Sequence, residues 1–456
     1  MSPGGSVTLS GKTRLSTREL FAFGLLAVPL STGGLPLVLY LTPHYAGELG
    51  LGLATIGLVM TLTRMTDIVT DPLIGALSDR TPARWGRRGL WMLLGLPVMA
   101  LATLAVFDPG PDPSLRYFFC AVALLYLGWT LIGIPLAAWV AEISPDYHER
   151  SRINGARILG GLVGSLIAIL APLAVIALQP GTVAAGSLAP TLRLLAWITV
   201  GLLVVAVPYL LYAVRQPVFV RRGSTTLAGG LRLIASNRSF RRLLASSVCA
   251  AIGWNSIHVL FVFFAMHYLQ ADQTQWPLIV LVYLVAQLIG TPVIVRLAPR
   301  FEKHRLLAVG SLIQIALFAL VLVMPPGQWM LYALLNFFTG LFAPVVAILA
   351  PSMAADVIDE DALANGSQRG ALFMALWGMA DKLAVAVATL IALPLIQFLG
   401  FDPAAPGDPA GLRALHYAFC LVPELFFVAS VAFIWNYPLT RARHTEIRAA
   451  LAVAPS

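Results

Sequence analysis

Long apolar segments alternate with short polar connections along the whole of this chain. Twelve segments approach or exceed the roughly 20 residues that a helix needs to cross a bilayer, the shorter ones with help from flanking residues. The pattern therefore predicts an all-α integral membrane protein with twelve transmembrane helices. The predicted spans are residues 21–41, 51–77, 90–107, 117–141, 156–178, 191–213, 243–269, 275–297, 306–323, 329–350, 370–399 and 413–437.

The connections alternate in charge, which predicts the orientation in the membrane. Because basic loops stay on the cytoplasmic side, we expect both termini in the cytoplasm, in a multi-pass protein of the inner or plasma membrane. The connections with almost no basic residues lie around residues 48, 108–112, 180–190, 272, 325–327 and 402–408. The others carry Arg80, Arg84, Arg87 and Arg88; Arg150 and Arg152; Arg215, Arg221, Arg222, Arg232, Arg238, Arg241 and Arg242; Arg300, Lys303 and Arg305; Arg369; and Arg441, Arg443 and Arg448.

A long basic stretch divides the chain into six spans plus six. This arrangement predicts two pseudo-symmetric six-helix bundles, because the loops at 78–88 and 297–305 also resemble each other in charge pattern. The predicted units are a cytoplasmic tail at 1–20, a bundle at 21–213, a basic cytoplasmic linker at 214–242, a bundle at 243–437 and a cytoplasmic tail at 438–456.

The composition excludes several classes of function. Of the 456 residues, 59% are hydrophobic and 11% are charged, whereas soluble proteins carry roughly a quarter charged residues. The net charge of +9 lies in the loops, so we interpret it as topological and expect no nucleic-acid partner. The three cysteines lie far apart in apolar segments and fit core positions. No phosphate-binding loop, nucleophile elbow or metal-ligand spacing occurs, so we predict a non-enzyme without a cofactor.

Two acidic residues interrupt the second apolar segment. Asp67 and Asp71 are four residues apart, so a helix places both on one face, about 6 Å apart. Like charges at that distance repel by roughly 3 kcal/mol at an effective dielectric constant of about 20. The pair therefore needs a proton, a metal cation or a basic side chain. The pattern predicts a cation site; the alternative is an ion-pair network with Arg64 and Lys382 that only holds helices together.

Several short motifs are distributed over the two halves of the chain, four in the first half and two in the second. They are Arg64 with Asp67-x-x-x-Asp71-Pro72-x-x-Gly75, Arg84-Trp85-Gly86-Arg87-Arg88, Gly128-Trp129-Thr130-x-x-x-Ile134-Pro135-x-x-x-Trp139, Arg150-x-Arg152 to Arg157, Ala355-Asp356-Val357-Ile358-Asp359, and Gln368-Arg369-Gly370 with Ala375-Leu376-Trp377 through Lys382. Together they resemble the glycoside–pentoside–hexuronide:cation symporters, the melibiose permease group of the major facilitator superfamily. The resemblance implies the major facilitator fold and symport by alternating access.

The resemblance also implies roles for individual residues. Lys382 would occupy the carboxylates when the ion is absent, and carboxylate and hydroxyl oxygens suit hard cations such as Na⁺, or a proton. The coupling ion would be Na⁺ or H⁺. The implied cation-binding residues are Asp67, Asp71, Thr70 and Thr130, and the implied coupling residues are Arg64, Lys382 and Arg157.

The substrate cavity departs from sugar-transporting relatives, which hold hydroxyls with acids on the first and fourth helices. Here no acid occurs between Glu19 and Glu48 or between Arg116 and Glu142. The two expected positions fall near Ser31 and on Gly133. An acid-poor cavity suits an amphiphile better than a bare sugar, so glycoside and amphiphile both stay open. The predicted cavity residues are Ser31, Gly133, Trp254, Asn255, His258 and Trp377.

Charged residues of the basic loops are candidates for a gate between the two halves, with topology anchors as the plain alternative. The predicted gating residues are Asp79, Arg84, Arg87, Arg88, Glu142, Arg150, Arg152, Asp356 and Asp359. We predict a monomeric secondary transporter that couples Na⁺ or H⁺ to uptake of a small organic substrate, a glycoside or other carbohydrate. The alternatives are a lysophospholipid or amphiphile symporter, a proton-coupled exporter, and a non-transporting membrane sensor or assembly factor.

Overall fold

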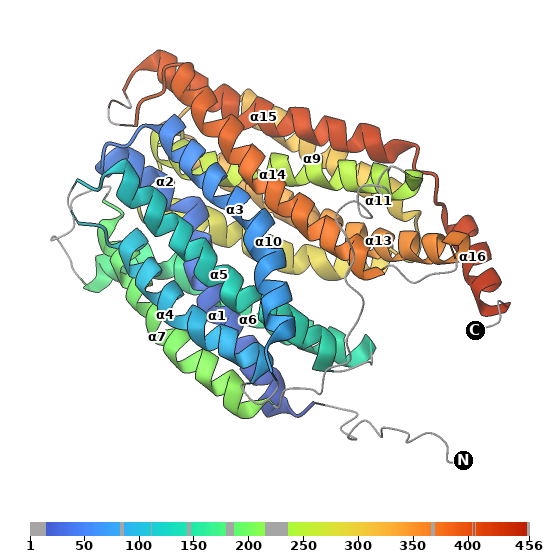
Figure 1. Ribbon diagram of the computed structural model, residues 1–456. Coiled ribbons are helices and arrows are strands. Elements are labelled where there is room, and N and C mark those ends of the chain that lie inside the picture. Colours follow the sequence, from blue (N-terminus) through green and yellow to red (C-terminus); the bar gives the residue numbers. More distant parts are fainter. Residues whose placement is uncertain are drawn as a thin grey trace.

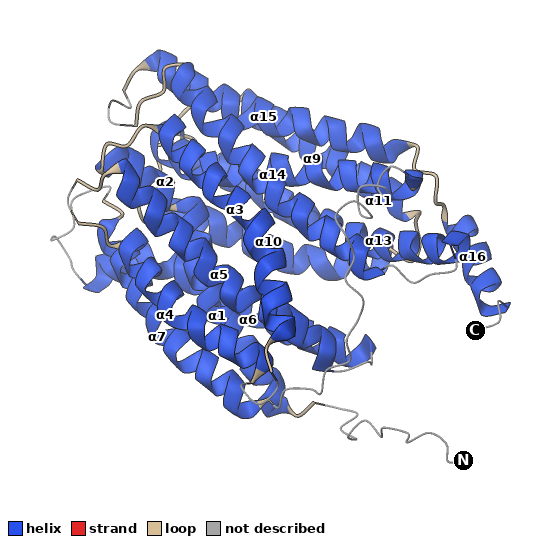
Figure 2. Cartoon of the chain, in the orientation of Figure 1, coloured by secondary structure: helices blue, strands red, loops and turns tan. Residues whose placement is uncertain are grey.

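The computed structural model describes residues 15–82, 86–110, 112–143, 147–178, 187–214, 236–365, 370–403, 405 and 407–453. Within these ranges all regular secondary structure is helical (Figure 2). Twelve helical stretches are long and apolar enough to cross a membrane, which confirms the predicted class and number of spans. Most of the predicted N-terminal tail and linker, at 1–14 and 215–235, lies outside the described residues. The spanning helices are α1 (Thr17–Leu39), α3 (Leu53–Arg80), α4 (Arg87–Phe107), α5 (Leu115–Ile143), α6 (Tyr147–Leu178), α7 (Ala189–Ala213), α9 (Arg238–Phe263), α10 (Gln275–Leu297), α11 (Lys303–Leu322), α12 (Trp329–Phe342) with α13 (Pro344–Asn365), α14 (Gly370–Phe398) and α15 (Pro409–Trp435).

Two regions differ from the sequence-based expectation. The tenth span was expected to end at residue 350, but α13 continues to Asn365. Its last turns are polar and therefore escape an apolar window; within them Asp356 pairs with Lys303 at 2.6 Å and Asp359 with His444 at 3.1 Å. The tail from 438 onward carries a further helix, α16 (Arg441–Val453), which packs on α13 and buries Ile447 to 1% exposure. One buried apolar side chain and several ion pairs hold this short helix in place.

The helices form two groups that meet along one central seam. The group α1 to α7 (first half) and the group α9 to α15 (second half) each pack mainly among themselves. Figure 1 shows α3 of the first half beside α14 of the second half at the centre of the molecule. Because the described chain has twelve spanning stretches, the start of α1 and the end of α15 lie at the same end of the molecule, which we call the terminal end. The second span, α3, and the seventh span, α9, run in opposite directions.

The first helix of each half finishes in the same backbone motif. Short π-helices, η1 (His44–Glu48) and η3 (Phe264–Tyr268), follow α1 and α9, with the three-residue α2 (Leu41–Pro43) before η1. A left-handed residue follows each of them, Gly50 with φ of 74° and Gln270 with φ of 54°. The side chains differ between the copies, so the repeat is visible in the backbone and not in the residue types.

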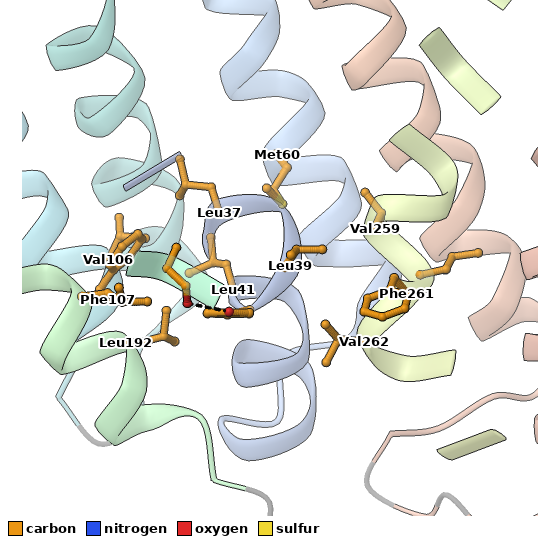
Figure 3. Close-up of a cluster of buried hydrophobic side chains, with 14 of the residues drawn as sticks. Leu37, Leu39, Leu41, Met60, Val106, Phe107, Leu192, Val259, Phe261 and Val262 are labelled. Atoms are coloured by element: carbon orange, nitrogen blue, oxygen red, sulfur yellow. Dashed lines mark hydrogen bonds between the residues drawn. The ribbon is translucent and has the colours of Figure 1, made fainter. Parts of the chain in front are cut away.

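The two halves are joined most closely at the end opposite the termini. The Gln397 side chain of α14 accepts a hydrogen bond from the Ala54 amide of α3 at 2.5 Å, and the Tyr40 and Trp276 rings meet edge to face at 5.2 Å. Figure 3 shows Leu37, Leu39 and Leu41 packed between side chains of α4 and α7 on one side and of α9 on the other. These apolar contacts seal the seam at the opposite end.

Candidate functional site

The paired carboxylates lie on one face of α3, where it passes the second half. Asp67 and Asp71 are one turn apart, with side chains 4% and 20% exposed. Lys382 of α14 extends between them: its Nζ lies 3.1 Å from Asp67 Oδ2 and also donates to Asp71 Oδ2. An ammonium group from one half thus bridges two carboxylates of the other half at the centre of the seam.

Two further residues complete this cluster. Thr130 of α5 donates to Asp71 Oδ1 at 3.0 Å, and an Arg64 guanidinium nitrogen lies 3.7 Å from Asp67 Oδ2. The guanidinium also sits over the Tyr126 ring, 4.2 Å from its centre, which adds a cation–π contact. Arg64 and Lys382 together carry two positive charges against two negative ones, so the cluster is electrically balanced.

The cluster leaves oxygen atoms without partners. Asp67 Oδ1 and Thr70 Oγ1 are buried and accept or donate no hydrogen bond. Buried polar atoms are normally paired, so these two oxygens are available to a ligand. Asp67 Oδ1, the Asp71 carboxylate and the Thr130 hydroxyl make an all-oxygen donor set, which is the kind that Na⁺ and other hard cations prefer. The contribution of Thr70 to that set stays a prediction. A proton on either carboxylate would use the same atoms.

A narrow pocket with about 20 Å³ of free space adjoins the cluster between the two halves. Arg64 and Tyr126 connect it to the carboxylates, and Asn255, a predicted cavity residue, lines it from α9. The pocket lies at the seam and has a mostly apolar wall; its use by a substrate stays a prediction. The lining residues are Leu37, Val38, Thr42, Met60, Arg64, Tyr126, Asn255, Val259, Val385 and Thr389.

The other predicted cavity residues lie elsewhere in this conformation. Ser31 faces Gly161 of α6, Gly133 faces the Trp129 ring, and Trp377 lies beside Asp381 on its own helix. Their contribution to substrate binding stays a prediction.

Trp254 lines a separate, very small pocket of about 10 Å³ inside the second half, with Gln314 and Phe427. The His258 ring lies 6.3 Å from that of Trp254.

Comparison with known proteins decides the family. The family described as "MFS/sugar transport protein" matches residues 20–441. This chain belongs to that family. An uncharacterised symporter of Synechocystis is 25% identical over 90% of this chain and 92% of its own length. A protein of Escherichia coli (strain K12), whose name proposes glycoside/cation symport, is 23% identical over 94% of each chain. In fold, the nucleoside transporter NupG matches 92% of this chain and all of its own, with a TM-score of 0.67 and 13% identity.

The sequence-based predictions of the major facilitator fold and of the glycoside–pentoside–hexuronide:cation symporter group are therefore confirmed. The protein is a multi-pass membrane transporter of a symporter family, and the family consists of transporters and not of enzymes.

Several of the predicted gating residues pair within one half. Arg88 of α4 bridges Asp79 at 2.6 Å and also donates to Ser78, both on α3. In the second half, His444 of α16 lies 3.1 Å from Asp359. Arg152 donates to the Leu15 carbonyl at 3.5 Å, and Arg87 is buried. Arg84 lies outside the described residues, as do the side chains of Glu142 and Arg150. The coupling residue Arg157 is half-buried on α6, and the gating and coupling roles stay predictions.

One cluster at the opposite end escaped the sequence analysis. Glu48 accepts from the Ser187 hydroxyl at 2.8 Å and from the Leu188 amide at 2.6 Å, while Gln273 of the second half donates to the Ser187 carbonyl at 2.9 Å. Burial pushes the pKa of Glu48 up, but these hydrogen bonds and the nearby His44 imidazole, 3.2 Å away, outweigh it and keep the pKa low. The sequence signal that could have indicated this cluster is Glu48 itself, an acidic residue in a connection that otherwise carries no charged side chain.

Proposed function

We propose that this symporter-family protein couples Na⁺ or H⁺ to the uptake of a small organic substrate, a glycoside or another carbohydrate derivative, by alternating access. The observation that carries the proposal is the Lys382 ammonium held between two carboxylates of the other half, Asp67 buried and Asp71 half-buried. A coupling cation would bind at Asp67 and Asp71 in place of that ammonium, helped by the Thr130 hydroxyl. The cell membrane with both termini in the cytoplasm is part of the same proposal.

The coupling follows from the position of Lys382 on the seam. While its ammonium bridges the carboxylates, α14 is tied to α3 and the empty carrier is neutral at its centre. The two carboxylates balance two positive charges, and Arg64 supplies one of them. A bound cation would supply the other, so it would displace the Lys382 ammonium and release α14. The ion then changes the relative stability of the two conformations, as coupling requires. Release of ion and substrate at the other face lets Lys382 return.

Ion binding is testable before any substrate is known. We expect NaCl, titrated against choline chloride between pH 5.5 and 8.5, to raise the melting temperature of the purified protein saturably, or protons to do so if H⁺ is the coupling ion. The Lys382→Gln variant lacks the ammonium that competes with the ion for the carboxylates. Its affinity for the ion should therefore be at least about tenfold higher, which corresponds to about 1.4 kcal/mol. Lys303→Gln removes a lysine that pairs with Asp356 and should leave the response unchanged. Indifference of the wild-type protein to both Na⁺ and pH would refute the proposal.

Thr130 is expected to contribute directly to ion affinity. Its hydroxyl reaches Asp71 from a neighbouring helix, and losing a hydrogen-bonding oxygen beside a charged group weakens binding by about tenfold. Thr130→Val should therefore bind the cation about tenfold more weakly in the same titration while keeping its melting temperature without salt within a few degrees. Thr103→Val is the matched control, because that buried hydroxyl bonds only its own helix at Met99. Equal affinities in the two variants would remove Thr130 from the site.

A further inference from the structure

Helix α5 contacts the charged stripe of α3 at two places. Arg64, Asp67 and Asp71 are three and four residues apart in the chain, so they share one face of α3. Tyr126 and Thr130, four residues apart, share one face of α5 in the same way. The Thr130 hydroxyl donates to Asp71 at 3.0 Å, and the Arg64 guanidinium lies over the Tyr126 ring, 4.2 Å from its centre. One face of α5 therefore holds both ends of the stripe.

A donor and an acceptor on this stripe stay unpaired. Arg64 Nε and Asp67 Oδ1 are both buried and have no hydrogen-bond partner. The two side chains approach to 3.7 Å, between Arg64 Nη1 and Asp67 Oδ2, which is longer than a hydrogen bond. Guanidinium and carboxylate groups readily form two parallel N–H···O bonds, because their planar shapes match. A contact must therefore hold the guanidinium away from that arrangement.

The Tyr126 ring supplies this contact. Its side chain is almost completely buried, so packing fixes the ring, and the guanidinium rests on the ring at a cation–π distance. Closing the gap to Asp67 would shift the guanidinium from its place over the ring, so the cation–π contact opposes the ion pair. Within the described part of the chain the structure gives the Tyr126 hydroxyl no hydrogen bond. The contact with Arg64 therefore depends on the ring and not on the hydroxyl.

The consequence for Asp67 rests on the proposed function. A carboxylate in a bidentate pair with arginine uses both of its oxygens on the guanidinium. Here Asp67 Oδ1 is unpaired, and Oδ2 accepts from Lys382 at 3.1 Å, the ammonium that the coupling ion would displace. Both oxygens are available to the ion only while Arg64 stays on the ring.

We propose that Tyr126 is a positioning residue of the ion site: its ring holds the Arg64 guanidinium back from Asp67 and so keeps this carboxylate available to the coupling cation. Tyr126 does not touch the ion itself and acts through Arg64. A ring that only packs α5 against α3 would affect stability alone. A ring that positions Arg64 also sets the affinity for the ion.

Ion affinity of purified variants tests this inference. NaCl is titrated against choline chloride while the melting temperature is followed, and the pH dependence of the melting temperature is recorded without Na⁺. In Tyr126→Leu, Arg64 is expected to close on Asp67, so Na⁺ should bind at least about tenfold more weakly, because a positive charge has moved closer to the site. If H⁺ is the ion, the midpoint of the pH response should fall by at least about one pH unit for the same reason. Tyr126→Phe keeps the ring and should respond as the wild-type protein does.

Two controls separate positioning from packing. Phe118→Leu removes a buried ring earlier in the same helix and should lower the melting temperature without changing ion affinity. In Arg64→Gln there is no guanidinium to hold back, so adding Tyr126→Leu should leave the ion affinity of that variant unchanged. Tyr126→Met fills more of the volume and gives the same comparison if Tyr126→Leu does not fold.

The outcomes distinguish this inference from the proposed function. If the wild-type protein responds to the ion and the ring-free Tyr126 variants bind it equally tightly, Tyr126 does not position Arg64, while the proposed function stands. The same conclusion follows if the effect of Tyr126→Leu persists in Arg64→Gln. If the wild-type protein responds to neither Na⁺ nor pH, the proposed function and this inference both fail.

Discussion

Replacing Asp71 with asparagine is expected to abolish ion-driven accumulation of substrate. In Asp71→Asn, Arg64 and Lys382 would face Asp67 alone, so the site would already carry one excess positive charge and an added cation would be strongly disfavoured at mid-membrane. Uptake into proteoliposomes under an imposed inward Na⁺ or proton gradient should fall to the level of empty vesicles, measured with a glycoside that raises the melting temperature of the wild-type protein. Within the described part of the chain, the polar contacts of Asp71 are with Lys382 and Thr130, so the variant should still fold.

A second membrane-embedded acid provides the control. Glu424 lies within α15 and takes no part in the carboxylate cluster, so Glu424→Gln should retain accumulation. Asp67→Asn should also lose accumulation, and it should be less stable than Asp71→Asn, because Asp67 is more deeply buried and lies beside both Arg64 and Lys382. If purified Asp71→Asn protein still concentrated substrate against its gradient, the coupling mechanism proposed above would be wrong.

Replacing Gly160 with leucine is expected to prevent assembly of the first half. Gly160 of α6 faces α1 so closely that a Cβ atom there would lie 1.9 Å from the Gly24 carbonyl oxygen. Four residues on, a Cβ at Gly164 would lie 2.3 Å from the Val28 carbonyl oxygen. Backbone atoms cannot move aside as a flexible side chain can, so the cost should exceed the about 1–3 kcal/mol usual for overpacking. Close helix contacts in membranes depend on such small residues.

The measurement is the yield of monodisperse protein by fluorescence-detected size exclusion of a tagged variant. Gly160→Leu should reduce that yield to background, and Gly160→Ala should already lower the melting temperature clearly. Gly201→Leu is the matched control, because a Cβ at Gly201 meets nothing within 4 Å. Normal yield and stability of Gly160→Leu would show that α1 and α6 do not pack as described.

The glycines of α6 show what a closer reading of the sequence could have found. Gly160 and Gly164 form a Gly-x-x-x-Gly pattern in an apolar helix, which is a known signature of tight helix packing. The pattern predicts a close contact but not its partner. Likewise, nothing in the residue types around Gly50 and Gln270 reveals the shared π-helical ending, because backbone conformation and not side-chain identity is repeated. The Glu48 cluster needed three separate segments to be brought together.

The sequence by itself determined the number of spans and the pairing of Asp67 with Asp71. Both are local properties: the length of an apolar run decides whether a helix crosses the bilayer, and a four-residue spacing places two side chains on one helix face. The family resemblance added Lys382 as a neighbour of that pair. Only the tertiary structure decided that its ammonium bridges the two carboxylates across the seam, 311 residues from Asp71 in the chain. The wall of the central pocket likewise comes from six helices whose rotation and packing no local pattern specifies.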